Sequence, residues 1–247
     1  MSKLYIVGTP IGNLEDITMR AIRVLSEVDH ILCEDTRVTQ KLLSHYNINT
    51  HCISYHQHSD LPKTNYIIKL LGEGKNLALV SDAGTPGISD PGGKLIQAVF
   101  EALGDSVEIE SVPGPSAVTA ALSISGIPTD KFVFLGFPPH KKGRQTFLKK
   151  ALASEYPVVI YESKHRILKL LSELKEITAS FNKDLGDKPE SKKKKKELIK
   201  KDLSSVVVCR ELSKMHETVY RGNIDRITEE IKKDANDQKG EFVVIVA

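Results

Sequence analysis

The sequence contains no tryptophan, and aromatic residues make up only 6% of its 247 residues. Proteins that bind single-stranded nucleic acid chiefly by stacking bases on aromatic rings need more such side chains, so this class is not favoured. The three cysteines, Cys33, Cys52 and Cys209, are an odd number without metal-site spacing, which predicts reduced thiols and no metal. No apolar run approaches the ~18 residues that a membrane helix needs, and no signal segment is evident. We therefore expect a cytoplasmic protein without a membrane partner.

Two common nucleotide-binding motifs are also missing. The sequence has neither G-x-G-x-x-G nor G-x-x-x-x-G-K-[ST], which counts against a dinucleotide site and against a P-loop. The first apolar run is followed instead by Gly8-Thr9-Pro10-Ile11-Gly12, with a proline where a helix would begin. A loop of backbone groups and small hydroxyls with few cations suits a ligand whose reactive end is not anionic.

The most informative stretch of the chain is Ser81 to Gly92, with the sequence SDAGTPGISDPG. It follows a short apolar run at 76–80, which predicts a buried strand, and it precedes helical spacing of apolar residues over 92–103. Gly84 and Gly87 lack a Cβ that could obstruct a ligand. In an open α/β sheet, ligands bind at the carboxyl ends of the strands, so we expect a binding loop here.

Three further strand ends have the same character. Loops rich in glycine, proline, hydroxyl or carboxylate groups occur at 8–13, 33–37 and 112–117, each after an apolar run. If the strands are parallel, all four loops converge on one edge of the sheet. The sequence therefore predicts a ligand cleft at that edge.

The order of apolar patterns predicts an α/β fold. In the first half, predicted strands at 3–7, 29–33, 50–54, 76–80 and 107–110 alternate with helices at 17–27, 37–45, 61–72, 92–103 and 114–124, which favours a mostly parallel sheet. The second half predicts strands at 131–135, 158–161, 205–209, 217–222 and 241–246, with helices near 142–153, 164–178 and 224–233. We expect an N-terminal domain at 1–112, a connecting segment at 113–127 and a C-terminal domain at 128–247.

Charge is distributed unevenly between these halves. Residues 1–112 carry nine Lys and Arg against 14 Asp and Glu, whereas the remainder carries 26 against 18. A basic half suggests a polyanionic partner. Part of the excess is the run Lys192–Lys196, which repels itself and is expected to be solvated.

The complete set of motifs resembles the RsmI family, the bacterial 16S ribosomal RNA 2′-O-ribose cytidine methyltransferases of the tetrapyrrole methylase superfamily. The resemblance runs in order from residue 4 to about 246, through GTPIGNL at 8–14, CEDTR at 33–37, the stretch 81–92, PGPSA at 113–117, GF at 136–137, YES at 161–163 and REL at 210–212. It implies two α/β domains of the tetrapyrrole methylase type with S-adenosylmethionine (SAM) in a cleft between them. It also implies a homodimer, and a cytidine in the decoding region of the small ribosomal subunit as substrate. A lysine-rich segment near 183–203 looks like an insertion relative to the family.

The resemblance also implies positions around the cofactor. The methionine side would be lined by Pro10, Gly84, Thr85 and Ile88, and the adenosine would be surrounded by Ser116, Ala117, Tyr161, Leu212 and Glu241. For Ile88 and Leu212, ordinary core packing is the alternative.

A ribose hydroxyl is a poor nucleophile, so methyl transfer to it would benefit from a general base. Candidate catalytic residues are Asp35, Asp82 and Glu211, each in a loop that the resemblance places near the cofactor. Asp35 could equally form a structural ion pair with Arg37. Candidate RNA-binding residues are the basic side chains on predicted loops and first helical turns, namely Arg37, Lys141, Lys142, Arg144, Lys164 and Arg166.

Two other functions stay open. One is a SAM-dependent methyltransferase of a tetrapyrrole precursor, which would share the fold. The other is a catalytically silent module that docks on the ribosome.

Overall fold

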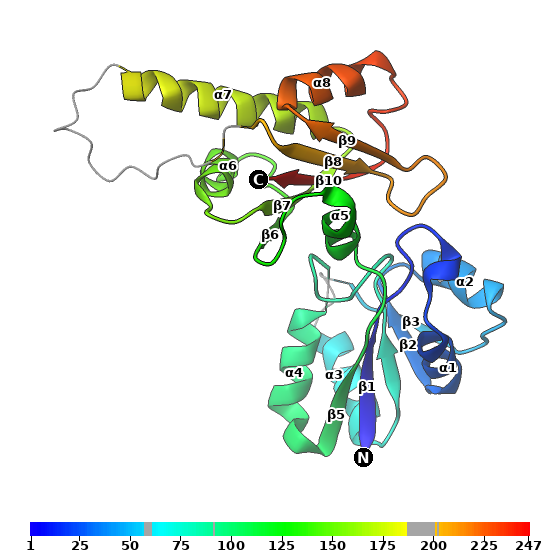
Figure 1. Cartoon of the computed structure of the whole chain (residues 1–247). Helices are drawn as coiled ribbons and strands as arrows, with labels where there is room; N and C mark the ends of the chain where they lie inside the picture. Colours follow the sequence, from blue (N-terminus) through cyan, green and yellow to red (C-terminus); the bar gives the residue numbers. More distant parts are fainter. Residues whose placement is uncertain (57–60, 91, 187–200, 202) are drawn as a thin grey trace. The chain divides into compact units, whose positions relative to one another are not determined.

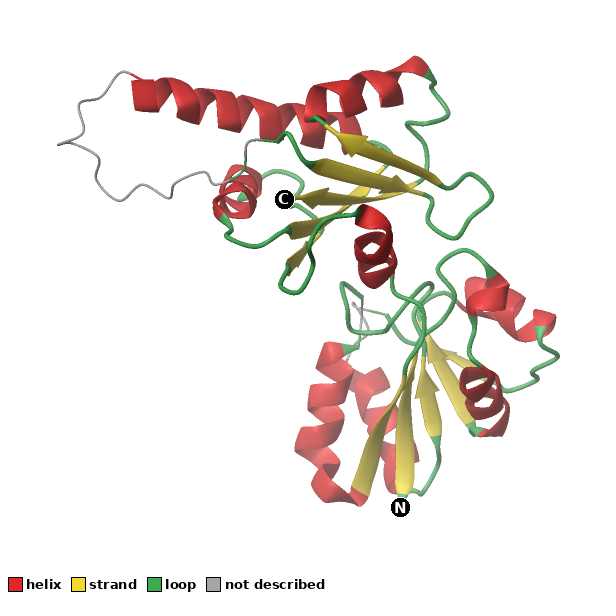
Figure 2. Ribbon diagram, in the orientation of Figure 1, coloured by secondary structure: helices red, strands yellow, loops and turns green. Residues whose placement is uncertain are grey.

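The computed structural model describes residues 1–56, 61–90, 92–186, 201 and 203–247 (Figure 1). The chain divides into two compact units, Met1–Ser116 and Ala117–Ala247. Each unit is an α/β structure, as predicted, with one sheet of five strands among the described residues (Figure 2). The run Lys192–Lys196 and most of the segment near 183–203 lie outside the described residues.

The sheet of the first unit is parallel throughout. Its strands are β1 (Ser2–Val7), β2 (His30–Cys33), β3 (Cys52–Ser54), β4 (Leu77–Leu79) and β5 (Val107–Val112), in the spatial order β3-β2-β4-β1-β5. The prediction of a mostly parallel sheet for the first half of the chain is confirmed. The carboxyl ends of β2, β4, β1 and β5 are therefore neighbours along one edge.

Helices cover both faces of this sheet (Figure 1). On one face, α1 (Met19–Glu27) and α2 (Thr36–His45) pack against residues such as Val7, Ile31 and Ala78. On the other face, α3 (Leu61–Gly72) and α4 (Gly93–Leu103) pack against Leu4, Leu32 and Leu77. Successive strand residues point to opposite faces, so a strand buried on both sides must be apolar throughout.

The second unit begins with α5 (Ala117–Ser125) and contains a mixed sheet. The strands are β6 (Val133–Gly136), β7 (Val158–Ser163), β8 (Val206–Arg210), β9 (Thr218–Gly222) and β10 (Glu241–Val246), in the order β6-β7-β10-β8-β9. Only β6 and β7 pair in parallel, and the other pairs are antiparallel.

Three helices build the main core of the second unit on one face of that sheet. They are α6 (Arg144–Ala153), α7 (Ile167–Gly186) and α8 (Ile224–Lys233), and they bury Leu148, Leu170 and Ile227 against the strands. Helix α5 packs against β10 and takes no part in this core. Among the described residues, no helix is both long and apolar enough to cross a membrane.

Candidate functional site

Four loops meet at the carboxyl edge of the first sheet, which confirms the predicted convergence. The backbones of Thr9 and Gly84 exchange two hydrogen bonds, of 2.9 and 3.1 Å, between the loops after β1 and β4. The N–H of Asp35, after β2, donates to Asp82 Oδ1 at 3.1 Å. Thr85 Oγ1 lies 3.4 Å from the carbonyl oxygen of Pro115, which follows β5. The predicted ligand loops are thus tied into one continuous surface within this unit.

Glycine is required where these loops come closest. A Cβ on Gly8 would lie 2.8 Å from backbone atoms of Gly114, so the two backbones could not approach this closely with any other residue. Gly84 has a φ of +81°, a conformation that L side chains rarely adopt. At Gly84 the backbone conformation, more than space, selects glycine, because a Cβ there would make only ordinary contacts.

Asp35 begins helix α2 and is bound by Arg37. Its Oδ1 accepts hydrogen bonds from the N–H of Arg37 at 2.8 Å and from Arg37 Nε at 3.0 Å, while Oδ2 accepts from Nη2 at 2.6 Å. These bonds to the Arg37 side chain and backbone lower the pKa of Asp35 to about 2. The structural ion pair considered from the sequence is therefore present, and it makes Asp35 a weak proton acceptor.

Further carboxylates lie at the same edge, and the sequence reasoning did not single them out. Burial, followed by repulsion from Glu34 and Asp82, raises the pKa of Asp90 to about 6. Burial and the Asp82 charge also raise the pKa of Glu34 above its usual value. The signal in the sequence was the second Ser-Asp pair of the stretch, Ser89-Asp90, which repeats Ser81-Asp82.

Glu211, the third catalytic candidate, lies in the second unit in a constrained loop after β8. Its φ is +51°, which is uncommon for a residue with a side chain, and its Oε1 accepts bonds from Lys214 Nζ and from the N–H of Glu241. Burial acts to raise the pKa of Glu211, but the bonds from Lys214 and Glu241 outweigh it and leave the pKa lowered. Glu211 is thus held as a carboxylate by two donors.

The residues expected around a cofactor occupy both units. In the first unit Pro10 and Gly84 are buried, Thr85 and Ser116 are half-buried, and Ile88 is 48% exposed, so Ile88 is not a core residue. In the second unit Leu212 is buried, as the core-packing alternative expects, while Ala117 and Tyr161 are half-buried. The exposed carboxylate of Glu241 pairs with Lys214 at 2.9 Å.

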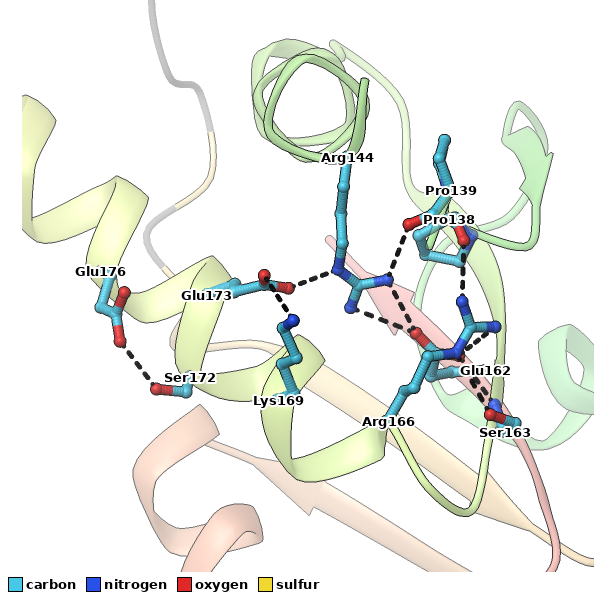
Figure 3. A network of polar contacts seen from close by, with 10 residues as sticks. All are labelled: Pro138, Pro139, Arg144, Glu162, Ser163, Arg166, Lys169, Ser172, Glu173 and Glu176. Atoms are coloured by element: carbon cyan, nitrogen blue, oxygen red, sulfur yellow. Dashed lines mark hydrogen bonds and ion pairs between the residues drawn. The ribbon is translucent and has the colours of Figure 1, made fainter. Parts of the chain in front are cut away.

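Two of the six predicted RNA-binding cations form an internal ion network in the second unit (Figure 3). The side chain of Glu162, which is 0% exposed, accepts from Arg144 Nη1 at 3.3 Å and from Arg166 Nη2 at 2.8 Å. Arg144 Nε also donates to Glu173 Oε2 at 2.6 Å. The Arg144 side chain is only 4% exposed, so its guanidinium is directed at carboxylates inside the unit and not at solvent.

The remaining predicted cations are accessible. Lys141, Lys142 and Lys164 are exposed, and the Arg37 side chain is 88% exposed although it is paired with Asp35. In the part of the chain that the structure describes, no group of three His, Cys, Asp or Glu residues could hold a metal ion.

Comparison with known proteins identifies the family. The model of the tetrapyrrole (corrin/porphyrin) methylases matches residues 3–228. Two bacterial proteins named ribosomal RNA small subunit methyltransferase I are similar over nearly the whole chain. The one from Hydrogenobaculum is 42% identical over 99% of this chain and 95% of its own. The one from Thermotoga maritima is 39% identical over 100% of this chain and 99% of its own.

The chain belongs to the ribosomal RNA small subunit methyltransferase I family of tetrapyrrole methylases. Among solved structures, a diphthine synthase superposes with a TM-score of 0.68 at 14% identity and covers 100% of this chain and 90% of its own. The cobalt precorrin-4 methyltransferase CbiF gives a TM-score of 0.65 at 18% identity, over 99% and 94% of the two chains. These two likenesses show the fold alone, and they confirm the predicted fold class.

Proposed function

We propose that this protein transfers a methyl group from SAM to the ribose 2′-oxygen of a cytidine in the decoding region of 16S ribosomal RNA. The observation that carries the proposal is the similarity of about 40%, over essentially the full chain, to proteins named ribosomal RNA small subunit methyltransferase I. The specific cytidine and the ribose oxygen come from the family resemblance of the motifs. The basic second half of the chain supports a polyanionic substrate.

The loop surface of the first unit fits the charge of SAM. SAM carries a sulfonium and an ammonium cation, and the exposed Asp82 and the half-buried Glu34 and Asp90 supply negative charge beside the glycine-rich backbone. In this proposal Pro10, Gly84, Thr85 and Ile88 hold the methionine part. The adenosine part is assigned to Ser116, Ala117, Tyr161, Leu212 and Glu241, and the cofactor supplies the electrophilic methyl group.

The chain itself has two tasks in such a reaction. It must align the acceptor oxygen with the methyl carbon and exclude water, which can lower the barrier by about 7 kcal/mol or more. It must also accept the proton of the hydroxyl. A general base works best when its pKa lies near the working pH, so Asp90, with a pKa of about 6, is better suited than Asp35, with a pKa of about 2. Asp82 remains a candidate, and Glu211 is held as a carboxylate by Lys214.

The experiment is a methyl-transfer assay with radiolabelled SAM and three substrates: assembled small subunits, naked 16S RNA and uroporphyrinogen. Digestion of the RNA product to nucleosides separates a 2′-O-methylated cytidine from a base-methylated one. Transfer to ribose in either RNA substrate supports the proposal. Transfer only to uroporphyrinogen would favour the tetrapyrrole alternative, and the absence of SAM binding would favour the silent module.

We further propose that the protein acts as a homodimer in the cytoplasm. The family resemblance is the support for this. Light scattering at micromolar concentration should give twice the chain mass of 27.4 kDa. A mass of one chain would reject the dimer.

A further inference from the structure

The segment Phe137–Gly143, which we term the 137–143 loop, joins β6 to α6 and is held by two arginines. Arg166 Nη1 donates to the carbonyl of Pro138 at 3.1 Å, and Arg144 Nη1 lies 3.4 Å from the carbonyl oxygen of Pro139 (Figure 3). Both guanidinium groups are fixed in turn by the fully buried Glu162. A loop with two consecutive prolines and two bound carbonyls has a well-defined path.

This loop presents one aromatic ring and two lysine cations to solvent. Phe137 is 51% exposed, although its ring packs edge-on against Tyr161 with centroids 5.3 Å apart. His140, Lys141 and Lys142 are exposed on the same loop.

The neighbouring turn adds to this positive surface. Arg166 links the loop to the turn that carries the exposed Lys164 and His165. Residues 137–143 and 163–166 contain no Asp or Glu. The surface therefore combines an anchored ring with positive charge and no competing carboxylate of its own.

We propose that the 137–143 loop binds an unpaired RNA nucleotide, with the base stacked on Phe137 and the flanking phosphates paired with Lys141 and Lys142. This inference rests on the proposed function and names the part of the second unit that receives the RNA. An unpaired base offers a free face for stacking, whereas a base in a duplex is already stacked between its neighbours. The low aromatic content of the chain is consistent with this, because one base needs only one ring.

The same geometry divides the five predicted RNA-binding cations of the second unit into two groups. Lys141, Lys142 and Lys164 are exposed and contact phosphate. Arg144 and Arg166 bind Glu162 and the loop carbonyls, so they are positioning residues that keep the loop in shape.

The test measures the affinity of the full chain for a fluorescent single-stranded RNA and for a duplex of the same sequence. Phe137→Ala should weaken single-strand binding by about tenfold, in the range found for loss of a base–aromatic stack. Phe137→Trp should retain binding and Phe137→Leu should not, because stacking needs a flat ring. Phe132→Ala is the matched control, since Phe132 is 41% exposed in the same unit and should change binding less than twofold.

Salt dependence separates the lysines from the ring. Replacing Lys141 and Lys142 together by alanine should reduce the slope of log affinity against log salt by about 1.4, since each phosphate contact on a single strand contributes about 0.7. The matched control is the double alanine variant of the exposed Lys149 and Lys150 on α6, which should leave the slope unchanged. SAM affinity should stay the same in both double lysine variants.

Several results would overturn the inference. The first two are loop variants that bind RNA as tightly as the wild type does, and a wild type that binds no RNA. The other two are loop-dependent binding that is equally tight for duplex and single strand, and loop-dependent binding of phosphatidylglycerol vesicles in place of RNA. Methyl transfer by the wild type to the small subunit is measured in parallel. Normal transfer with loop-independent RNA binding rejects this inference alone, whereas loop-dependent binding without transfer rejects the proposed function alone.

Discussion

Replacing Glu162 by glutamine should destabilise the second unit strongly. The carboxylate is fully buried and accepts from both guanidinium groups and from the N–H of Ser163 at 2.8 Å. Glutamine keeps the size of the side chain but removes the charge, so Arg144 is left 4% exposed with Glu173 as its remaining ion-pair partner, and Arg166 is left without one among the described residues. Loss of one partner from a buried pair costs about 3–5 kcal/mol, because the other charge remains buried.

Because Arg144 keeps its bond to Glu173, we expect the loss in the free energy of unfolding to lie at the lower end of this range, about 3 kcal/mol. For a chain of this size that loss corresponds to a fall in Tm of roughly 6–12 °C. The matched control is Glu27→Gln on α1, where the side chains of Arg23 and Glu27 are 59% and 58% exposed. An exposed pair of this kind contributes about 0.5 kcal/mol or less.

The assay is urea unfolding of both variants, followed by circular dichroism, together with hydrogen exchange of peptides from β7 and α6. Hydrogen exchange assigns the loss to the second unit, which matters because a chain of two units need not unfold in one step. If the free energies of unfolding of Glu162→Gln and Glu27→Gln differ by less than 1 kcal/mol, the network does not stabilise this unit and the reasoning is wrong.

Four further outcomes follow from the site. Ile88→Ala should weaken SAM binding, measured by calorimetry, without changing the free energy of unfolding, because Ile88 is 48% exposed. This variant is a cleaner probe than Gly84→Val, which would also strain a backbone with φ of +81°. The rate of methyl transfer should rise with pH through about pH 6 as Asp90 loses its proton, and Asp90→Asn should abolish that rise; an unchanged profile would remove Asp90 as the base. Arg37→Ala should lose methyl transfer while SAM affinity stays unchanged. If RNA binding also weakens, Arg37 binds an RNA phosphate; if RNA binding is unchanged, Arg37 acts by orienting Asp35. Unchanged turnover would reject both roles. Deleting Lys192–Lys196 should leave SAM affinity unchanged, and a loss of cofactor binding would show that the run is not merely a solvated segment.

Much of the fold could be predicted because local patterns determine it. The alternation of apolar strands and amphipathic helices in the first half indicated a parallel sheet, and the strand order then brings the loops after β1, β2, β4 and β5 together. The antiparallel pairing of β10 with β7 and β8 could not be predicted. Such pairs join residues such as Phe242 and Glu162, which are far apart in the sequence.

The ion network around Glu162 could not be predicted from the sequence for a different reason. Arg144 looked like a surface cation at the start of a basic helix, and nothing local says that its partners lie on β7 and α7. One signal was available, because Val158, Ile160 and Glu162 share one face of a strand and the first two are apolar. A carboxylate in phase with a buried face requires a cationic partner. The Ser89-Asp90 pair draws attention to Asp90, but the raised pKa of Asp90 could not be predicted from it, since that pKa depends on burial and on Glu34, a residue from another loop.

The central claim concerns the RNA that is modified in the cell. Nucleoside mass spectrometry of 16S RNA tests it most directly, in a strain without this gene and in the same strain with the gene restored. The account predicts that one 2′-O-methylated cytidine in the decoding region disappears in the first strain and returns in the second. Identical 16S methylation in both strains would contradict it.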